Sequence, residues 1–181
     1  AMADLVEAGK IRSVGVSNFS AERMRRAHQQ LARRGLPLAV NQVLYSLLDR
    51  SIETNGILDT AKELGITIIA YTPLASGLLT GKYHKHPELL QKKFFYWRNS
   101  LQRGLEKSCP LVQALEEISA HYNATPAQVA LNWVINFHGD TIVTIPGATK
   151  VHQAEESAGA QKFNLSTDEM ARLDELSRGN L

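Results

Sequence analysis

The chain has 181 residues, of which 44% are apolar and 21% charged, and its formal net charge is +2 at pH 7. This composition is ordinary for a globular domain, and so small a charge argues against a nucleic-acid partner. The sequence shows no apolar run of membrane-spanning length and no signal-peptide pattern, so we expect no membrane partner. One cysteine, Cys109, excludes an internal disulfide and fits a reducing compartment, the cytoplasm or an organelle interior.

The first part of the chain predicts short strands that alternate with helices. Residues 1–9 resemble the last turns of a helix that ends at Gly9, so we expect the domain to be truncated at its N-terminus. Ser20 is a good N-cap for the helix that follows the first strand. The elements expected in this part are a strand over 11–16, a helix from Ser20 to Gly35, a strand over 38–44, a helix over 52–64 and a strand over 66–71.

The second part predicts a long connection over 77–105 and then more helices. Cys109 and Pro110 stand near an expected helix start, and Thr125 with Pro126 is a strong start signal for the next helix. Ser166 and Glu169 form a capping box. The elements expected here are helices over 111–122 and 126–137, a strand over 141–145, and helices over 151–160 and 166–178.

Four short, largely apolar strands followed by helices predict an α/β fold with a parallel sheet, in one domain over 1–181. Four βα units are enough for an open sheet and are half of a closed (β/α)8 TIM barrel. Polar residues gather where the strands end, at Ser17-Asn18, Gln42, Tyr71 and 146–148. Ligands of parallel α/β folds bind at that edge of the sheet, so we expect the site there.

The segment 66–75, ITIIAYTPLA, carries the strongest local signal. Tyr71 ends an apolar run, a rigid turn follows, and small residues 75–77 let a ligand approach the backbone closely. This combination suits a flat cofactor ring. The alternative is a buried strand with a tyrosine at its rim.

Five segments occur in a characteristic order, and together they resemble the aldo-keto reductases, (β/α)8 barrels that reduce aldehydes and ketones with NADPH. The resemblance covers essentially the whole chain and maps to the C-terminal half of the barrel, its fifth to eighth strands. The segments are GKIRSVGVSNFS (9–20), VNQVLYSLLDR (40–50), IIAYTPLASGLLTGKY (68–83), TPAQVALNWVI (125–135) and IPGATKVHQAEESAGA (145–160).

The resemblance implies roles at the nicotinamide end of the cofactor. Ser17, Asn18 and Gln42 would hydrogen-bond the carboxamide, and Tyr71 would stack on the nicotinamide ring. Without the resemblance, Asn18 could equally be a left-handed turn residue and Gln42 a satisfied polar group of the core.

The resemblance also implies a phosphate and adenosine end. Leu74 and Ser76 would contact the pyrophosphate. The loop between the last strand and the helix that follows it would bind anionic oxygens. Two departures from the family pattern, Ala148 and Ser157, weaken the implied preference for NADP(H), so NAD(H) is not excluded. The implied adenosine-end residues are Gly147, Ala148, Thr149, Lys150, Gln153, Glu156 and Ser157.

The family's catalytic tyrosine, lysine, aspartate and histidine lie on the first half of its barrel, outside the matched segments. We therefore assign no catalytic residue and expect the chain alone to be inactive. Its expected partners are a nicotinamide dinucleotide and the missing N-terminal half-barrel. Two alternatives remain open: a non-enzymatic module that closes by homodimerisation, and a truncated product of marginal stability.

Two further segments have weaker signals. His84 and His86 have no third ligand at a suitable spacing, so we expect no metal site. The stretch 92–98, KKFFYWR, favours a lid loop or a partner-packing patch over nucleic-acid stacking.

Overall fold

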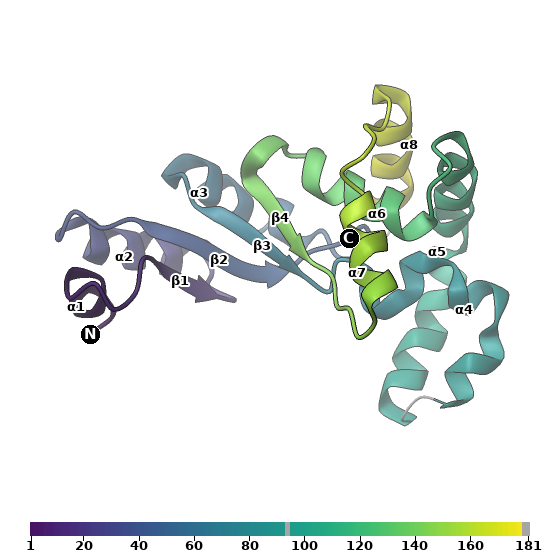
Figure 1. The fold of residues 1–181 in the computed structure, drawn as a ribbon, viewed down its shortest axis with the longest axis horizontal. Helices are drawn as coiled ribbons and strands as arrows, with labels where there is room; N and C mark the ends of the chain where they lie inside the picture. The colour runs from purple at the N-terminus through teal and green to yellow at the C-terminus, as the bar shows by residue number, and fades with distance from the viewer. Residues whose placement is uncertain (93–94, 179–181) are drawn as a thin grey trace.

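The computed structural model describes residues 1–92 and 95–178. Its centre is a four-stranded parallel sheet in which the strands follow one another in chain order, from β1 to β4 (Figure 1). This confirms the predicted α/β fold with a parallel sheet. The strands are β1 (Val14–Ser17), β2 (Leu38–Leu44), β3 (Thr67–Tyr71) and β4 (Ile142–Ile145).

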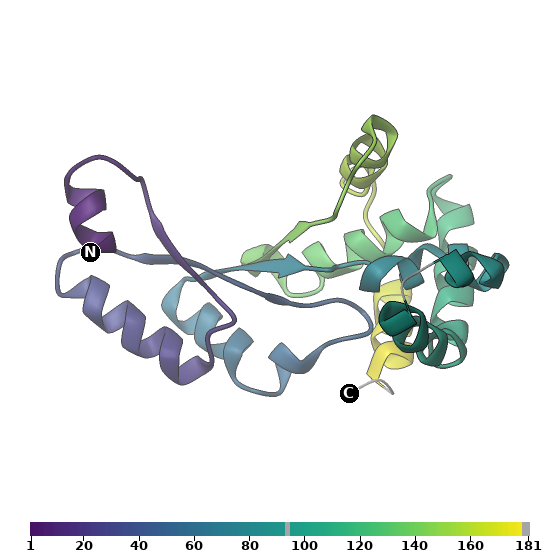
Figure 2. The same cartoon turned by 90° about the horizontal axis from the view of Figure 1, so that it is seen from below.

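The two faces of the sheet differ in how well they are covered. Alternating strand residues such as Val43, Ile68 and Ile142 are buried, and α2 and α3 lie together on one side of the strands (Figure 2). On the other face Val143 and Ile145 are each 47% exposed. Residues of this exposed face stand in register across the sheet, since Ser17 pairs with Gln42, Gln42 with Ile69 and Ile69 with Val143.

The helices of the first part are α1 (Met2–Glu7), α2 (Ala21–Ala32) and α3 (Ile57–Leu64). The amide of Arg23 donates to the Ser20 hydroxyl at 3.4 Å, which confirms the predicted N-cap. The helix predicted over 52–64 is wrong in its first turn. Gly56 has φ 81°, so a separate 3-10 turn η1 (Ser51–Glu53) precedes α3. A left-handed residue cannot continue a right-handed helix.

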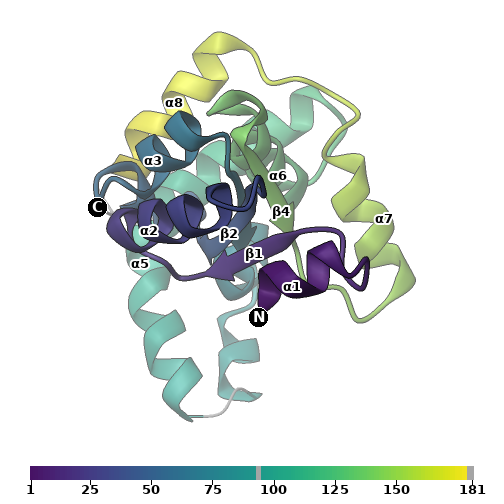
Figure 3. The same cartoon turned by 90° about the vertical axis from the view of Figure 1, so that its left-hand side faces the viewer.

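The long connection after β3 forms an excursion that extends away from the sheet (Figure 3). It contains the 3-10 segments η2 (Ala75–Thr80) and η3 (Pro87–Lys92), the short helix α4 (Lys82–Lys85) and the first turns of α5 (Phe95–His121). The stretch 92–98 that predicted a lid or partner patch includes residues 93 and 94, so this prediction lies outside the described residues.

The helix start predicted near Pro110 is wrong, because α5 runs through this proline without a break. Proline removes one main-chain donor, so the carbonyl of Glu106, four residues earlier, loses its helical partner. Side chains contact the carbonyls just before it. The Ser108 hydroxyl donates to the carbonyl oxygen of Gly104 at 2.7 Å, and His84 Nε2 lies 3.2 Å from the carbonyl oxygen of Leu105. The second contact links α4 to the turn that precedes the proline.

The last helices begin where the sequence predicts. The Thr125 capping box starts α6 (Pro126–Asn136), and the Ser166–Glu169 box precedes α8 (Thr167–Arg178). Between them lie the 3-10 turn η4 (Gly139–Thr141), β4 and α7 (Val151–Gly159). Among the described residues, no helix is both long enough and apolar enough to cross a bilayer.

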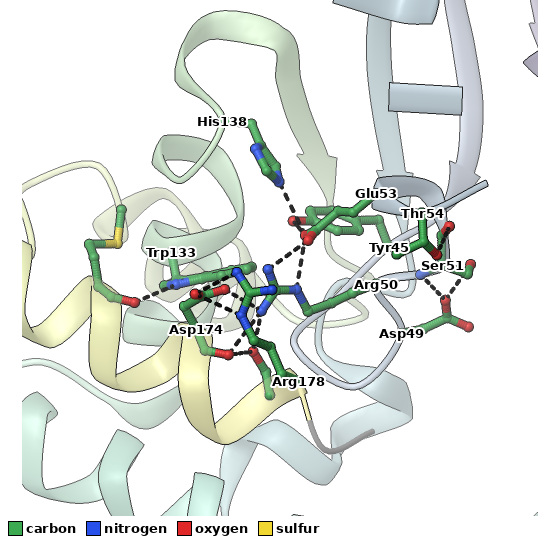
Figure 4. A network of polar contacts seen from close by, with 12 residues as sticks. Tyr45, Asp49, Arg50, Ser51, Glu53, Thr54, Trp133, His138, Asp174 and Arg178 are labelled. Carbon is green, nitrogen blue, oxygen red and sulfur yellow. Dashed lines mark hydrogen bonds and ion pairs between the residues drawn. The ribbon is translucent and has the colours of Figure 1, made fainter. Parts of the chain in front are cut away.

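A buried arginine ties the loop after β2 to the last helix (Figure 4). The Arg50 guanidinium pairs with Glu53 at 2.6 Å and with Asp174 of α8 at 2.7 Å, and its carbon lies 4.8 Å from the ring centroid of Trp133. Tyr45 and His138 also contact the Glu53 carboxylate, at 2.6 and 3.1 Å. This cluster fixes the position of the loop that leaves the carboxyl end of β2.

Candidate functional site

The carboxyl ends of β1, β2 and β3 bring together the four residues predicted for the nicotinamide end. The Ser17 hydroxyl and the main-chain N–H of Asn18 both donate to the main-chain carbonyl of Gln42, at 3.0 and 2.9 Å. The Tyr71 hydroxyl donates to Asn18 Oδ1 at 3.3 Å. Tyr71 is half-buried, so part of its ring remains accessible.

Asn18 also fulfils the alternative interpretation of its segment, since its φ of 55° is left-handed. A buried neighbour that the sequence reasoning missed, Asn41, holds this turn. Its side chain donates to the carbonyl of Phe19 at 3.0 Å and accepts from the Phe19 amide at 3.4 Å. The sign of this role in the sequence is that Asn41 is polar but stands at a core-facing position of an apolar strand.

Left-handed backbone concentrates at this edge of the sheet. Thr72, Ala75 and Ser76 have φ values of 54°, 48° and 56°, and Gly77 continues with 94°. In residues other than glycine such conformations cost about 1–3 kcal/mol each, and they cluster at ligand-binding sites in proteins. The turn after Tyr71 is therefore held in a shape that the chain would not adopt locally.

A cavity of about 530 Å³ lies beside this turn, between the end of β4, α6 and α7. Its volume is within the range of about 300–1,000 Å³ that small-molecule sites occupy. Six predicted cofactor residues line it: Leu74, Ser76, Gly147, Gln153, Glu156 and Ser157. Thr72 and Ile145 also line it, and these adjoin Tyr71 in sequence and in strand register. The cavity thus continues from the edge that carries Tyr71.

The remaining predicted residues surround the start of α7. The amides of Thr149 and Lys150 donate to Gln153 Oε1 at 2.8 and 3.1 Å, so Gln153 caps the helix with its oxygen. Its side-chain NH₂ group is left for other partners. Ala148, Thr149 and Lys150 are exposed and are not among the residues that line the cavity.

The cavity also contains residues that the sequence reasoning did not assign. Tyr83 is buried and lines it, and Lys82 Nζ lies 5.5 Å from the Tyr83 ring centroid. Both residues belong to the segment 68–83, one of those that resemble the aldo-keto reductases, and this membership is the sign in the sequence that could have pointed to them. Lys82 places a cation at the mouth of the cavity, where an anionic ligand would benefit from it.

Other candidate groups have structural partners. The hydroxyls of Tyr45 and Tyr122 donate to Glu53 and Glu169, at 2.6 and 2.5 Å. His84 Nε2 lies 3.0 Å from the Ser108 hydroxyl, and burial lowers the pKa of His84. Within residues 1–92 and 95–178, no group of three His, Cys, Asp or Glu side chains is placed to hold a metal ion. A larger cavity of about 780 Å³ between η3 and α5 contains none of the predicted site residues.

Known proteins resemble this chain over most of its length. Residues 1–178 match the description "Aldo/keto reductase family". The chain is 38% identical over 98% of its length to aldo-keto reductase str7 of Strobilurus tenacellus, and 35% identical over 97% to L-glyceraldehyde 3-phosphate reductase of Escherichia coli K12. It is also 38% identical over 94% to a probable pyridoxal reductase 2 of Schizosaccharomyces pombe.

A solved structure gives the same result. The crystal structure of a thermostable aldo-keto reductase, Tm1743, with the inhibitor epalrestat superposes with a TM-score of 0.72 and 30% identity, over 97% of this chain and 52% of that one. The chain spans about half the length of the curated relatives it matches, 51–52% for the three named above.

Proposed function

Because the chain belongs to the aldo/keto reductase family, we propose that it forms the NADP(H)-binding half of a reductase barrel. In this proposal its four strands are the fifth to eighth of a (β/α)8 barrel. The parent reaction is the NADPH-dependent reduction of an aldehyde or ketone. Two relatives are named as reductases of pyridoxal and of L-glyceraldehyde 3-phosphate, which are both aldehydes.

One observation supports the proposal above the others: the edge that joins Asn18 and Tyr71 continues into the cavity lined by Ser76 and Glu156. A dinucleotide is long, with a flat ring at each end and two phosphates between. Such a molecule needs a ring platform, an anion site and a second ring site in one continuous groove. The strand ends and α7 supply these three parts in that order.

Each part has a side chain suited to its task. Bound nicotinamide dinucleotide would supply a hydride at its nicotinamide ring. Tyr71 offers a flat face to that ring, and the amides of Asn18 and Gln42 match its carboxamide as donors and acceptors. Ser76 and Lys82, which carry a hydroxyl and an ammonium group, line the stretch where the phosphates would lie. Gln153 and Glu156 line the end assigned to the adenosine.

We further propose that this chain alone does not transfer the proton that carbonyl reduction requires. Burial raises the pKa of Tyr45, and its hydrogen bond to Glu53 raises it further. The hydrogen bond to Glu169 raises the pKa of Tyr122. A general acid needs a pKa that falls toward the working pH, so neither residue suits the role.

The experiment is a titration of the chain with NADPH, followed by nicotinamide fluorescence, and a turnover assay with a general aldehyde. We expect saturable binding and no turnover. NADH in a parallel titration reports the selectivity between the two dinucleotides. Rapid turnover would overturn the claim that the proton donor lies elsewhere, and absence of binding to either dinucleotide would overturn the cofactor assignment.

A second candidate function is a cofactor-binding module that closes its sheet by homodimerisation. The observation that favours it is the exposed apolar face at the edge strand, where Val143 and Ile145 are each 47% exposed. A second copy could cover this face and pair the open edges. Sedimentation at micromolar concentration tests it, since a stable monomer would contradict the pairing. For either function we propose a reducing compartment, the cytoplasm or an organelle interior, from the single cysteine.

A further inference from the structure

Helix α7 carries one end of the candidate site but is attached mainly at its other end. Among its described residues only Gly159, the last, is buried, whereas Val151 at its start is 77% exposed. Figure 2 shows α7 projecting from the body of the molecule. The cavity-lining residues Gln153 and Glu156 therefore depend for their position on bonds near the carboxyl end of the helix.

One side chain of α6, Gln128, bonds to α7 at Glu156, a residue that lines the cavity. Its Nε2 donates to the main-chain carbonyl of Glu156 at 2.9 Å, and its Oε1 accepts from the amide of Thr125 at 2.9 Å. The carboxamide is thus fixed at both of its polar atoms, by the capping box of α6 and by α7. Gln128 itself is not among the residues that line the cavity.

The contact between the helices also needs a residue without a side chain. A Cβ atom placed on Gly159 would overlap Nε2 of Gln128. Asn132 lies four residues after Gln128 on α6. Its side chain donates to the main-chain carbonyls of Ala160 and Phe163, at 2.8 and 2.6 Å, in the segment that follows α7. Residues four apart share one face of a helix, so Gln128 and Asn132 form a single amide face that holds the end of α7.

We propose that Gln128 is a positioning residue that sets where α7 presents Gln153 and Glu156 to the adenosine end of the dinucleotide. This inference rests on the proposed function above. The donor of Gln128 fixes the backbone of Glu156, which is itself one of the residues that line the cavity. Asn132 fixes the chain only after the helix has ended, so it cannot replace this bond.

The first test uses Gln128→Glu, which keeps an acceptor for the Thr125 amide but puts an oxygen in place of the donor to the Glu156 carbonyl. We expect about tenfold weaker binding of adenosine 2′,5′-bisphosphate, the adenosine-end fragment, because one hydrogen bond becomes a repulsive contact. Nicotinamide mononucleotide should bind as it does to the unaltered chain. Gln113→Glu makes the same chemical change at an exposed position of α5 and should affect neither fragment.

A loss of affinity for both fragments would mean that Gln128→Glu disturbs the fold in general, and this would overturn the proposal. Unchanged binding of both would overturn it as well. Calorimetry with each fragment gives the comparison directly.

The second test uses the steric match between the two helices. Gly159→Ala should weaken binding of the adenosine-end fragment when Gln128 is present. In the Gln128→Ala background the same substitution should have little further effect, because the overlapping group is gone. If the double variant loses affinity by the product of the two single losses, the two positions act independently, and this would contradict a direct contact between them.

A third measurement needs no ligand and separates this inference from the proposed function. Hydrogen exchange of the α7 amides should speed up in Gln128→Glu relative to those of α8, and Gln113→Glu should leave both unchanged. If the unaltered chain binds neither fragment, the proposed function fails while the exchange result still decides whether Gln128 holds α7. Equal exchange in all three chains would overturn the positioning role.

Discussion

The guanidinium of Arg50 reaches the last described helix and pairs with the carboxylate of Asp174 at 2.7 Å, although 124 residues separate them in the chain. Arg50 is 1% exposed and also donates to the Ser177 hydroxyl at 2.7 Å. The loop that ends β2 and the helix α8 are therefore joined by a charge that has no access to water. This relationship gives the clearest expectation for stability.

We expect Arg50→Ala to lower the free energy of unfolding by about 3–5 kcal/mol, because it takes the buried guanidinium away from the partly buried carboxylates of Glu53 and Asp174. Arg25→Ala is the matched control. Arg25 pairs with Glu63 at 2.6 Å on the surface, where solvent screens the charges, so its loss should lower the free energy of unfolding far less. Urea unfolding of both variants measures the difference, and equal losses would contradict the importance of burial.

The same cluster predicts a dependence of stability on pH. Burial by itself would raise the pKa of Glu53, but hydrogen bonds from His138, Arg50 and Tyr45 outweigh it and lower this pKa from 4.5 to about 2. A carboxyl with a lowered pKa stabilises the fold above its unfolded pKa and loses this contribution as pH falls through the folded value. The stability difference between the unaltered chain and Glu53→Gln should therefore narrow between pH 4.5 and pH 2.

Urea unfolding at a series of pH values tests this expectation. Glu169, whose pKa is also about 2, keeps part of the acid sensitivity in both chains. Parallel curves for the two chains through this pH range would show that Glu53 is not held in its charged form by the fold.

Ser76 combines a left-handed backbone with a place in the lining of the cavity, and two substitutions separate the effects of its backbone and its hydroxyl. Its φ of 56° suits glycine, so Ser76→Gly should be about 1 kcal/mol more stable than Ser76→Ala. Both variants remove the hydroxyl and should weaken NADPH binding to a similar extent. Thermal unfolding and fluorescence titration of the pair give the two quantities. Greater stability in the alanine variant would argue against the left-handed conformation.

Tyr71 should contribute to binding through its ring more than through its hydroxyl. We expect Tyr71→Ala to weaken NADPH binding about tenfold, since aromatic stacking contributes about 0.5–1.5 kcal/mol beyond buried area. Tyr71→Phe keeps the ring and removes only the long bond to Asn18, so it should bind nearly as well as the unaltered chain. If Phe and Ala weaken the binding of NADPH alike, the stacking role is wrong.

The fold was predictable where the signals are local. β2 has the predicted bounds, and the caps at Ser20, Thr125 and Ser166 each accept the expected amide. The errors came from contacts distant in sequence or from one backbone angle. Pro110 stays within a helix, and the turn before it is contacted by His84, which belongs to another element.

In the site, too, the sequence predicted what depends on local patterns and topology and did not predict what depends on contacts distant in sequence. Parallel strands place all their carboxyl ends at one edge, so the meeting of Ser17, Asn18 and Tyr71 followed from topology. Lys82 reaches the cavity through the path of the excursion after β3, which no local pattern specifies. The link from Gln128 to Glu156 depends on how two helices pack, and the sequence around either residue contains no sign of it.

The most direct test of the cofactor assignment is a map of backbone amide chemical shifts during titration of the chain with NADP⁺. We expect saturable changes at Ser17, Asn18, Gln42 and Tyr71, and along 74–77 and 147–157, with α1 and α2 unaffected. Changes confined to other surfaces, or none at millimolar dinucleotide, would contradict the assignment.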